Sequence, residues 1–398
     1  MEEIKQESKK KRFIIGIIKI LITLAVIFVV IEVFLRIFFP QPVFKHTVLE
    51  ASPQIFEESD DLVFELEKGK STRHFNTIEE FNVSININSL GFRDSEFTKE
   101  KPNNVYRILF LGDSNTFGWG VEIENVFTEV LERKLNQNLD GRFEVINAGW
   151  AKGNSPDNYY VYLKNKKFEL DPDLIIVEFS IFNDFEIHEW EIDNDGLPIR
   201  VYDNSFFIDE FGRTRAVNNI TKGGFKDLVY RTNVFLTFHS HFYTLFKNYF
   251  RNILNYFWEG GAEPGLFGKN YTEELNHNIN QTTRLILKMD ELSKEDNRAF
   301  ALVIIPRSVQ VLEPKIKDKY GNLLNWSRPN VELTRLREEH DIKVLDLTPE
   351  LRIYIKENTE QIYFQHDPHW NERGNEVVAN MIYEWLLDEG LLPDTNTK

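Results

Sequence analysis

Residues 107–115 read RILFLGDSN, and this stretch decides the fold. Its apolar run is too short for a typical helix and is what a strand buried on both faces of a parallel sheet requires. The run ends directly in a tight Gly-Asp-Ser turn, so Ser114 lies at the carboxyl end of the predicted strand. Apolar residues then follow at helical spacing from Phe127 to Leu135, which predicts a strand-turn-helix unit.

The strand-then-helix pattern recurs along the chain. Further apolar runs of strand length occupy residues 143–147, 174–179, 299–305 and 343–347, and a last helix is predicted over 377–386. Alternating strands and helices of this kind form a parallel sheet with helices on both faces. Ligands of such sheets bind beyond the carboxyl ends of the strands, so the chemistry is expected at that edge.

Composition sets limits on size, partners and redox chemistry. The chain has 398 residues, of which 42% are hydrophobic, enough for one large α/β domain with additions. Its formal net charge of −16 repels phosphate backbones, so nucleic acid is not an expected partner. Cysteine is absent, which removes disulfides, thiolate metal sites and a cysteine nucleophile.

The amino-terminal segment predicts a membrane anchor. Residues 13–39 read FIIGIIKILITLAVIFVVIEVFLRIFF, with no charged side chain between Ile20 and Ile31. About 20 such residues cross a bilayer, and the basic residues within 1–12 predict a cytoplasmic tail. We therefore expect a single-pass membrane protein whose catalytic part is periplasmic or extracellular. No small-residue cleavage site follows, which favours an uncleaved anchor over a removed signal peptide or a buried core helix.

The remaining chain divides into an appendage and a large domain. Residues 40–103 predict a small N-terminal β appendage, since EFNVSININ at 80–88 alternates apolar and polar side chains. Residues 104–390 predict the α/β domain, with an insertion over about 185–290. The insertion contains an aromatic-rich stretch, 228–258, with helical spacing. That stretch is interpreted as a hairpin packed on the sheet, a lid over the site, or a face lying on the bilayer.

Two motifs carry residues suited to acyl transfer. A Ser at the carboxyl end of a strand is exposed near a helix amino terminus, although Gly-Asp-Ser is also an ordinary turn. Near the carboxyl end, FQHDPHWN at 364–371 offers a base, His369, and an orienting carboxylate, Asp367. The alternatives are a capping turn with a solvated His, or a metal site that includes His366. No further ligand cluster is found, so no metal is expected.

Two other strand ends supply potential oxyanion donors. NAGWAKGN at 147–154 follows the second predicted strand, and Asn183 follows the third. A glycine N–H and an asparagine amide both donate hydrogen bonds without taking a proton. Each motif alone is typical of a turn, but Ser, Gly, Asn and His at four strand ends in this order indicate a catalytic constellation.

This constellation resembles the SGNH (GDSL) hydrolase superfamily over roughly residues 104–386. The resemblance implies a flavodoxin-like three-layer α/β/α fold and acyl-ester chemistry without a metal or organic cofactor. It makes Ser114 the nucleophile, His369 the base and Asp367 its partner. Ser114, Gly153 and Asn183 would form the oxyanion hole.

The chain departs from the common superfamily pattern in two places. In the common pattern the acidic residue lies three positions before the base, and this chain has His366 there. Its Asp-x-His-Trp-Asn form is instead similar to alginate O-acetylation proteins and other membrane-anchored bacterial relatives. The second block is one residue longer than in the common pattern, so Gly149 competes with Gly153 as the donor. NSLGFRD at 88–94 is also shared with those anchored relatives, without a defined role.

Three functions follow from these motifs. The first is an ester hydrolase or deacetylase acting on an acylated envelope or exported carbohydrate or lipid. The second is an O-acyltransferase modifying an exported polysaccharide, with an acyl exporter as a possible partner. The third is a non-catalytic glycan-binding or scaffold protein that kept the fold, which an intact Ser114, Asp367 and His369 argue against.

Overall fold

A computed structural model describes four long ranges of the chain, 2–39, 55–150, 155–216 and 265–394, together with the short pieces 232, 236, 240–243, 245 and 246. Within the long ranges, the following residues are not described: 60–61, 63, 76–79, 167–168, 182, 186–190, 194–196, 200–205, 209–213, 314, 316–321 and 366. The chain divides into two compact units. One comprises residues 1–48 and 219–260, and the other comprises 49–218 and 261–398.

A five-stranded parallel sheet forms the centre of the larger unit. Its spatial order is β13-β12-β7-β5-β6, with all four neighbouring pairs parallel. The bounds are β5 Val105–Gly112, β6 Arg142–Gly149, β7 Leu174–Ser180, β12 Ala299–Ile305 and β13 Lys343–Asp346. Counted along the chain, these five strands have the order 2-1-3-4-5, which is the flavodoxin-like order. The predicted fold and its five strands are confirmed.

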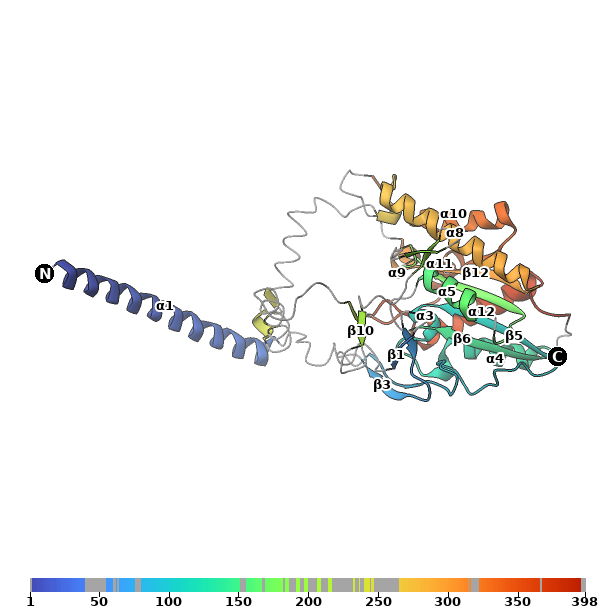
Figure 1. Ribbon diagram of the computed structural model, residues 1–398, viewed down its shortest axis with the longest axis horizontal. Coiled ribbons are helices and arrows are strands. Elements are labelled where there is room, and N and C mark those ends of the chain that lie inside the picture. The colour runs from blue at the N-terminus through green and yellow to red at the C-terminus, as the bar shows by residue number, and fades with distance from the viewer. Residues whose placement is uncertain are drawn as a thin grey trace. The chain divides into compact units, whose positions relative to one another are not determined.

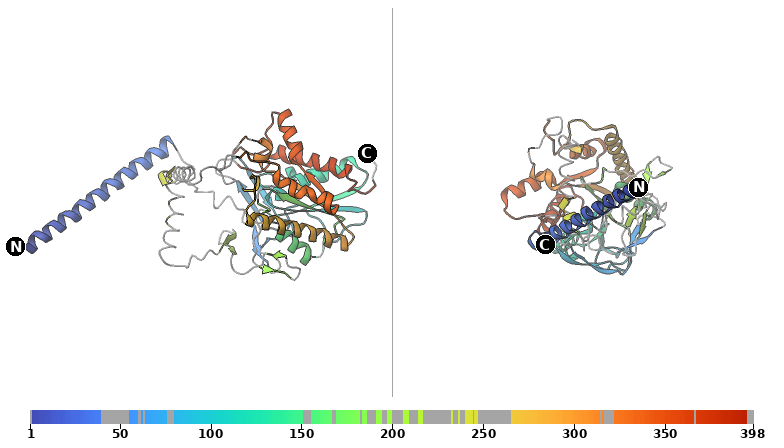
Figure 2. Two further views of the ribbon diagram at one scale, coloured as in Figure 1. Left: turned by 90° about the horizontal axis from the view of Figure 1, so that it is seen from above. Right: turned by 90° about the vertical axis from the view of Figure 1, so that its left-hand side faces the viewer.

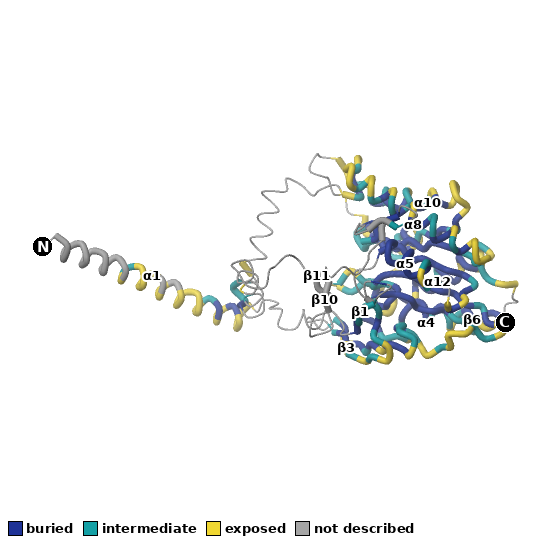
Figure 3. The backbone as a smooth tube through the Cα atoms, viewed as in Figure 1, coloured by how far each residue is buried: buried dark blue, intermediate teal, exposed yellow. Residues whose placement is uncertain are grey.

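Helices cover both faces of this sheet, giving three layers (Figures 1 and 2). Helices α5 (Pro156–Lys166), α8 (Glu273–Glu295) and α10 (Arg328–His340) lie on one face, and α4 (Phe127–Asn138), α11 (Thr348–Glu357) and α12 (Glu372–Asp388) on the other. Alternate residues of β5 enter the two cores: Leu109 and Leu111 face α5 and α8, while Ile108 and Phe110 face α4 and α12. The strands are therefore buried on both sides, as Figure 3 shows in dark blue.

Shorter elements complete the larger unit. They are hairpins β1 (Phe56–Glu58)–β2 (Phe64–Leu66), β3 (Ser71–Phe75)–β4 (Asn82–Asn86), β8 (Glu191–Ile192)–β9 (Pro198–Ile199) and β10 (Phe206–Ile208)–β11 (Thr214–Ala216), helices α3 (Ser114–Phe117) and α9 (Ser308–Leu312), and 3-10 turns at Ile123–Asn125 and Gly265–Phe267. The first two hairpins lie in the segment predicted as a β appendage. Helix α8, at the end of the predicted insertion, packs against α5 and β12.

The motif NSLGFRD, which had no assigned role, forms a turn at the end of the appendage. The Asn88 side chain accepts hydrogen bonds from the backbone N–H groups of Leu90 and Phe92. Gly91 has φ +94°, a left-handed conformation in which a side chain would be strained. This turn directs Arg93 into the large domain.

Arg93 ties the appendage to the segment that follows Ser114. Its buried guanidinium donates to the backbone carbonyls of Phe117 at 2.7 Å, Gly118 at 2.5 Å and Val121 at 2.6 Å. A cation at the last carbonyls of a helix also interacts favourably with the helix dipole. One side chain of the appendage therefore fixes the end of α3, the helix that begins at Ser114.

The smaller unit contains α1 (Glu2–Phe38), which includes the predicted anchor. Within it, Ile15–Phe38 is long and apolar enough to cross a membrane, by length and composition alone. Among the side chains of α1 that the structure describes, only Glu32 and Leu35 are buried.

Replacing Arg93 by Met should destabilise the larger unit by about 3 kcal/mol, because three buried carbonyls would lose their charged donor. Urea unfolding of detergent-solubilised protein measures the loss. Arg73→Met is the control, since exposed Arg73 on β3 bonds only within its own hairpin and its loss should change stability little. Equal stability of the two variants would contradict the assigned role of Arg93.

Candidate active site

The turn that carries Ser114 is shaped by the glycine before it and by its own cap. A Cβ on Gly112 would lie 2.2 Å from Thr116 Oγ1 and 2.4 Å from Glu178 Oε2, so only glycine fits there. The Asp113 carboxylate accepts from the N–H of Asn115 at 2.8 Å, which caps α3. Ser114 is therefore the first residue of a short helix that starts at the carboxyl end of β5.

The loop that carries His369 is fixed by local hydrogen bonds. One oxygen of Asp367 accepts both the backbone N–H of His369, at 3.0 Å, and its ring Nδ1, at 2.5 Å. This is an Asx turn, and it explains how a carboxylate only two residues away reaches the ring. On the far side, Asn371 caps α12 by accepting from the N–H of Gly374. An isolated antiparallel bridge between Tyr363 and Trp370 closes the loop.

The two motifs meet at the carboxyl edge of the sheet. Ser114 Oγ lies 2.7 Å from His369 Nε2, within hydrogen-bond distance, although 255 residues separate them in sequence. In the tautomer with Nδ1 protonated toward Asp367, Nε2 carries the lone pair and can accept a hydrogen bond from the Ser114 hydroxyl. The side chains of His369 and Asp367 are 19% and 21% exposed, so solvent and a substrate reach the pair.

The pKa of Asp367 favours its ionised form, which accepts hydrogen bonds. Burial alone raises the pKa of this carboxyl, but the hydrogen bonds and charge of His369 outweigh it and bring the pKa below its ordinary value. A carboxylate that stays ionised stabilises the imidazolium that forms when His369 takes a proton.

Trp119 supports the His369 ring and was not predicted from the sequence. The two rings stack at 5.5 Å with an angle of 27°, and His74 of the appendage contacts the same indole edge-on at 4.2 Å. Burial lowers the pKa of His74 to about 3, and the nearby charge of Arg93 acts in the same direction. His74 is therefore a neutral packing group at physiological pH. The sequence contains no spacing signal that joins residues 74, 119 and 369.

A group of buried carboxyls lies behind the nucleophile turn. Glu178 of β7 accepts from the N–H of Asp113 at 3.0 Å and from Thr116 Oγ1 at 3.1 Å. Burial raises the pKa of Glu178 well above its ordinary value, and the adjacent carboxyls of Asp113 and Asp184 add to that shift. Burial likewise raises the pKa of Asp184, with Asp113 contributing. The raised pKa favours the neutral form of Glu178, which holds the Ser114 turn through these two hydrogen bonds.

A cavity of about 280 Å³ opens beside Ser114 and His369. Asn183, after β7, lines it, as do Ser180 and Arg307, the latter after β12. Arg307 is a further residue that sequence reasoning missed, because a single Arg after a strand has no distinguishing pattern. The cavity reaches the ends of several sheet strands, which is where an α/β sheet binds its ligand.

The structure describes Gly149 but not Gly153, the two glycines predicted as oxyanion donors. Gly153 lies outside the described residues, as does His366. The N–H of Gly149 donates to the Asn147 side chain at 3.0 Å, and a Cβ on Gly149 would lie 2.2 Å from the backbone nitrogen of Phe117. Gly149 thus allows close packing of β6 against α3, and its own N–H is already engaged.

No group of three or more His, Asp or Glu side chains that could hold a metal ion occurs among the described residues.

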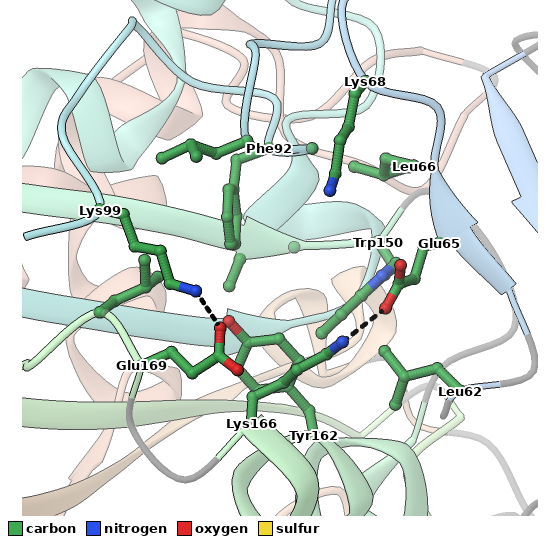
Figure 4. A pocket seen from close by; sticks show the side chains of 15 residues that line it. Leu62, Glu65, Leu66, Lys68, Phe92, Lys99, Trp150, Tyr162, Lys166 and Glu169 are labelled. Carbon is green, nitrogen blue, oxygen red and sulfur yellow. Dashed lines mark ion pairs between the residues drawn. The ribbon is translucent and has the colours of Figure 1, made fainter. Parts of the chain in front are cut away.

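A second cavity, of about 150 Å³, lies between the appendage and α5. Figure 4 shows Trp150, Tyr162 and Lys68 around it, and ion pairs from Lys99 to Glu169 and from Lys166 to Glu65 close its sides.

Comparison with known proteins assigns the class. Residues 265–397 match a family model described as "SGNH hydrolase-like domain, acetyltransferase AlgX". Over those residues the chain carries an SGNH hydrolase-like domain, which supports an ester hydrolase or acyltransferase. Within the class, the matched model agrees with the predicted similarity to alginate O-acetylation proteins.

Solved structures match the chain at low similarity. The lipase/acylhydrolase from Enterococcus faecalis is 13% identical over 74% of this chain and 98% of its own, with a TM-score of 0.38. An acetyl xylan esterase is 13% identical over 70% of this chain and 98% of its own, with a TM-score of 0.37. A two-domain esterase active on acetylated mannans is 14% identical over 75% of this chain and 52% of its own, with a TM-score of 0.38. A comparison with curated proteins finds no match.

Glu178→Gln should make stability less dependent on pH. Because the folded-state pKa of Glu178 is raised, its stabilising contribution is full below the ordinary value of 4.5 and is lost as pH rises toward the folded-state pKa. Glutamine keeps an oxygen that accepts from Asp113 and Thr116 but does not titrate. Chemical unfolding from pH 5 to 8 should show the wild type losing up to about 1.4 kcal/mol per pH unit relative to the variant.

The control for this experiment is Glu124→Gln, which changes an exposed carboxyl and should leave the wild-type profile unchanged. Parallel profiles for wild type and Glu178→Gln would mean that Glu178 is ionised in the folded protein, contrary to this prediction.

Proposed function

We propose that the protein is a serine-dependent acyl-ester hydrolase, an esterase or deacetylase that acts through an acyl-enzyme intermediate on an acylated envelope or exported glycan or lipid. The observation that carries the proposal is the hydrogen-bonded series Ser114 Oγ, His369 Nε2, His369 Nδ1 and Asp367 Oδ1, at 2.7 Å and 2.5 Å. A nucleophile, a base within hydrogen-bond reach and a carboxylate that orients the base are the parts that acyl transfer needs. A non-catalytic scaffold has no need of this arrangement.

The mechanism follows from the proton positions. Ser114 Oγ attacks the ester carbonyl carbon while its proton passes to His369 Nε2, forming a tetrahedral oxyanion. When the ester C–O bond breaks, the imidazolium returns that proton to the leaving alcohol oxygen, and the acyl group stays on Ser114. Water, deprotonated by the same nitrogen, then attacks the acyl-enzyme and releases the carboxylic acid and the free serine.

The oxyanion is proposed to bind the backbone N–H of Ser114, the N–H of Gly153 and the side-chain amide of Asn183. The place of Asn183 in the cavity beside Ser114 supports its role. Ser114 begins a helix at the carboxyl end of a strand, where backbone N–H groups and the helix dipole favour negative charge.

The site is proposed to face the periplasm or the exterior. Residues 13–39 would cross the membrane, 1–12 would remain cytoplasmic, 40–103 would form the appendage and 104–390 the catalytic domain with its insertion at about 185–290. Support comes from the apolar stretch Ile15–Phe38 and from the basic residues before it. A catalytic domain held at that surface would meet envelope glycans and lipids rather than cytoplasmic substrates.

A second candidate function is O-acyl transfer to an exported polysaccharide. The matched family model, whose description names an acetyltransferase, favours it. Transfer uses the same acyl-enzyme, with a sugar hydroxyl in place of water, and would need an acyl donor delivered across the membrane, for which an acyl exporter is the expected partner.

Loss of either reactive side chain should abolish activity without unfolding the protein. Ser114→Ala and His369→Ala should each lower the rate of p-nitrophenyl acetate hydrolysis by about 10³-fold or more, because the triad acts as a unit. A fluorophosphonate probe should label the wild type at Ser114 and leave Ser114→Ala unlabelled. Thermal melting measures whether the fold is kept.

His366→Ala is the matched control, since His366 is the residue that would occupy the acidic position of the common pattern. It should retain most of the activity, whereas Asp367→Ala should lose most of it. If His366→Ala abolished activity and Asp367→Ala did not, the proposed pairing of Asp367 with His369 would be wrong. If the probe still labelled Ser114→Ala, the assignment of Ser114 as the nucleophile would be wrong.

Acceptor competition separates hydrolysis from transfer. If hydrolysis is the function, adding polysaccharide or oligosaccharide acceptors should leave the ratio of released acetate to consumed donor near one. Transfer predicts that this ratio falls as acceptor rises, with the acetyl group recovered on sugar by mass spectrometry. Ser114→Ala is the blank for both measurements, because each route passes through the acyl-enzyme.

A further inference from the structure

Glu32 poses a physical problem for the anchor helix. It lies within the apolar stretch Ile15–Phe38, six residues before its end, which corresponds to about 9 Å along a helix. An ionisable side chain at that depth in a membrane is expensive unless it pairs with another polar group. Arg36, one turn later, donates to Glu32 Oε1 at 2.9 Å but meets only part of that requirement.

The remaining partners of Glu32 come from the aromatic-rich insertion. Ser240 Oγ and the N–H of Phe242 donate to Oε2 at 2.9 and 3.0 Å, and the N–H of His241 donates to Oε1 at 2.9 Å. Ser240 also accepts from the N–H of Tyr243 at 3.0 Å, so it caps the turn that follows. Glu32 and Ser240 are 9% and 4% exposed, which shows that this contact is closed.

The contact continues toward the middle of the apolar stretch. The Phe242 ring meets the edge of the Phe28 ring at 5.5 Å and 87°, one helical turn deeper than Glu32. Phe246 stacks on Phe242 at 6.2 Å, which extends the aromatic face beyond the helix. The insertion therefore lies against α1 at the level of residues 28–32 rather than beyond its end.

The outer face of this element is apolar. Leu245 and Phe246 are 39% and 53% exposed, and Val29 and Val33 of α1 are exposed as well. Water would penalise such apolar surfaces, whereas acyl chains would not. Because the contacts with Phe28 and Glu32 lie within the apolar stretch Ile15–Phe38, the occupant at this depth is the bilayer.

We infer that residues 240–243, 245 and 246 belong to a second membrane-associated element, which docks on α1 through Glu32 and presents Leu245 and Phe246 to the acyl chains of the outer leaflet. The inference rests on the proposed membrane anchor and is independent of the catalytic assignment. Of the three interpretations that the sequence left open for residues 228–258, it selects the face on the bilayer.

Lipid quenching tests this placement, and the absence of native cysteine makes single labels unambiguous. Full-length Phe246→Cys labelled with bimane is reconstituted in phosphatidylcholine vesicles that contain lipids with a nitroxide on the acyl chain. Val26→Cys on α1 is the positive control and exposed Ile353→Cys on α11 the negative control. We expect quenching at position 246 at least half as strong as at position 26.

The controls distinguish the possible failures. Quenching at 26 with none at 246 would overturn the inference and leave the anchor standing. No quenching at 26 would overturn the anchor, and this inference with it. In both cases fluorophosphonate labelling of Ser114 reports separately on the catalytic site.

Cross-linking tests the docking contact itself. In vesicles, a short bis-methanethiosulfonate reagent should join Phe28→Cys to Phe242→Cys much faster than it joins Val29→Cys to Phe242→Cys, because residue 29 lies on another face of α1. Adding Glu32→Ala should slow the first reaction by about tenfold, since three hydrogen bonds are lost, while Thr23→Ala should not. Equal rates for the two pairs, or no effect of Glu32→Ala, would overturn the docking.

Discussion

Parallel pairing of five buried strands is the constraint on which the rest of the molecule depends. Because the strands run in one direction, their carboxyl ends lie at one edge, where the turns after β5, β7 and β12 lie together. The 2.7 Å contact between Ser114 and His369 exists only because that edge and the start of α12 are held by packing on both faces of the sheet. A shift in strand register would separate Ser114 from His369.

A second constraint holds the turn that carries Ser114. Three buried polar side chains from different parts of the chain hold α3: Arg93 binds its last carbonyls, Asn147 donates to the carbonyl of Thr116, and Glu178 accepts from Asp113 and Thr116. Burying such groups is costly unless they are bonded, so these hydrogen bonds also favour one conformation of the turn. The appendage is thus part of the support of the active site, because it supplies Arg93 and also His74, which packs on the Trp119 indole beneath His369.

A polar group buried in an apolar setting also explains the smaller unit. Glu32 on α1 is buried like Glu178 in the sheet, and it accepts from backbone N–H groups of His241 and Phe242. Each of these buried acidic groups therefore accepts hydrogen bonds from donors on another segment of the chain.

Much of the fold and of the candidate site could be read from the sequence, because those features depend on local patterns. Short apolar runs predicted five parallel strands, since a strand buried on both faces has no polar side to show. Gly-Asp-Ser after a strand and Asp-Pro-His before a helix indicated a nucleophile and a base, because turn chemistry and two-residue spacing are local properties. The assignment of catalytic roles to Ser114, Asp367 and His369 remains a prediction.

The tertiary structure alone decided which distant residues meet. Nothing local relates Arg93 to Phe117, Trp119 to His369, Glu178 to Asp113 or Glu32 to Ser240, since each contact depends on how separate elements pack. NSLGFRD is recognisable as a motif in the sequence, but only the tertiary structure places Arg93 on the backbone carbonyls at the end of α3. Sequence determines which groups a segment can offer, whereas long-range packing determines which partners they find, because hydrogen bonds and ring contacts act only over a few ångströms.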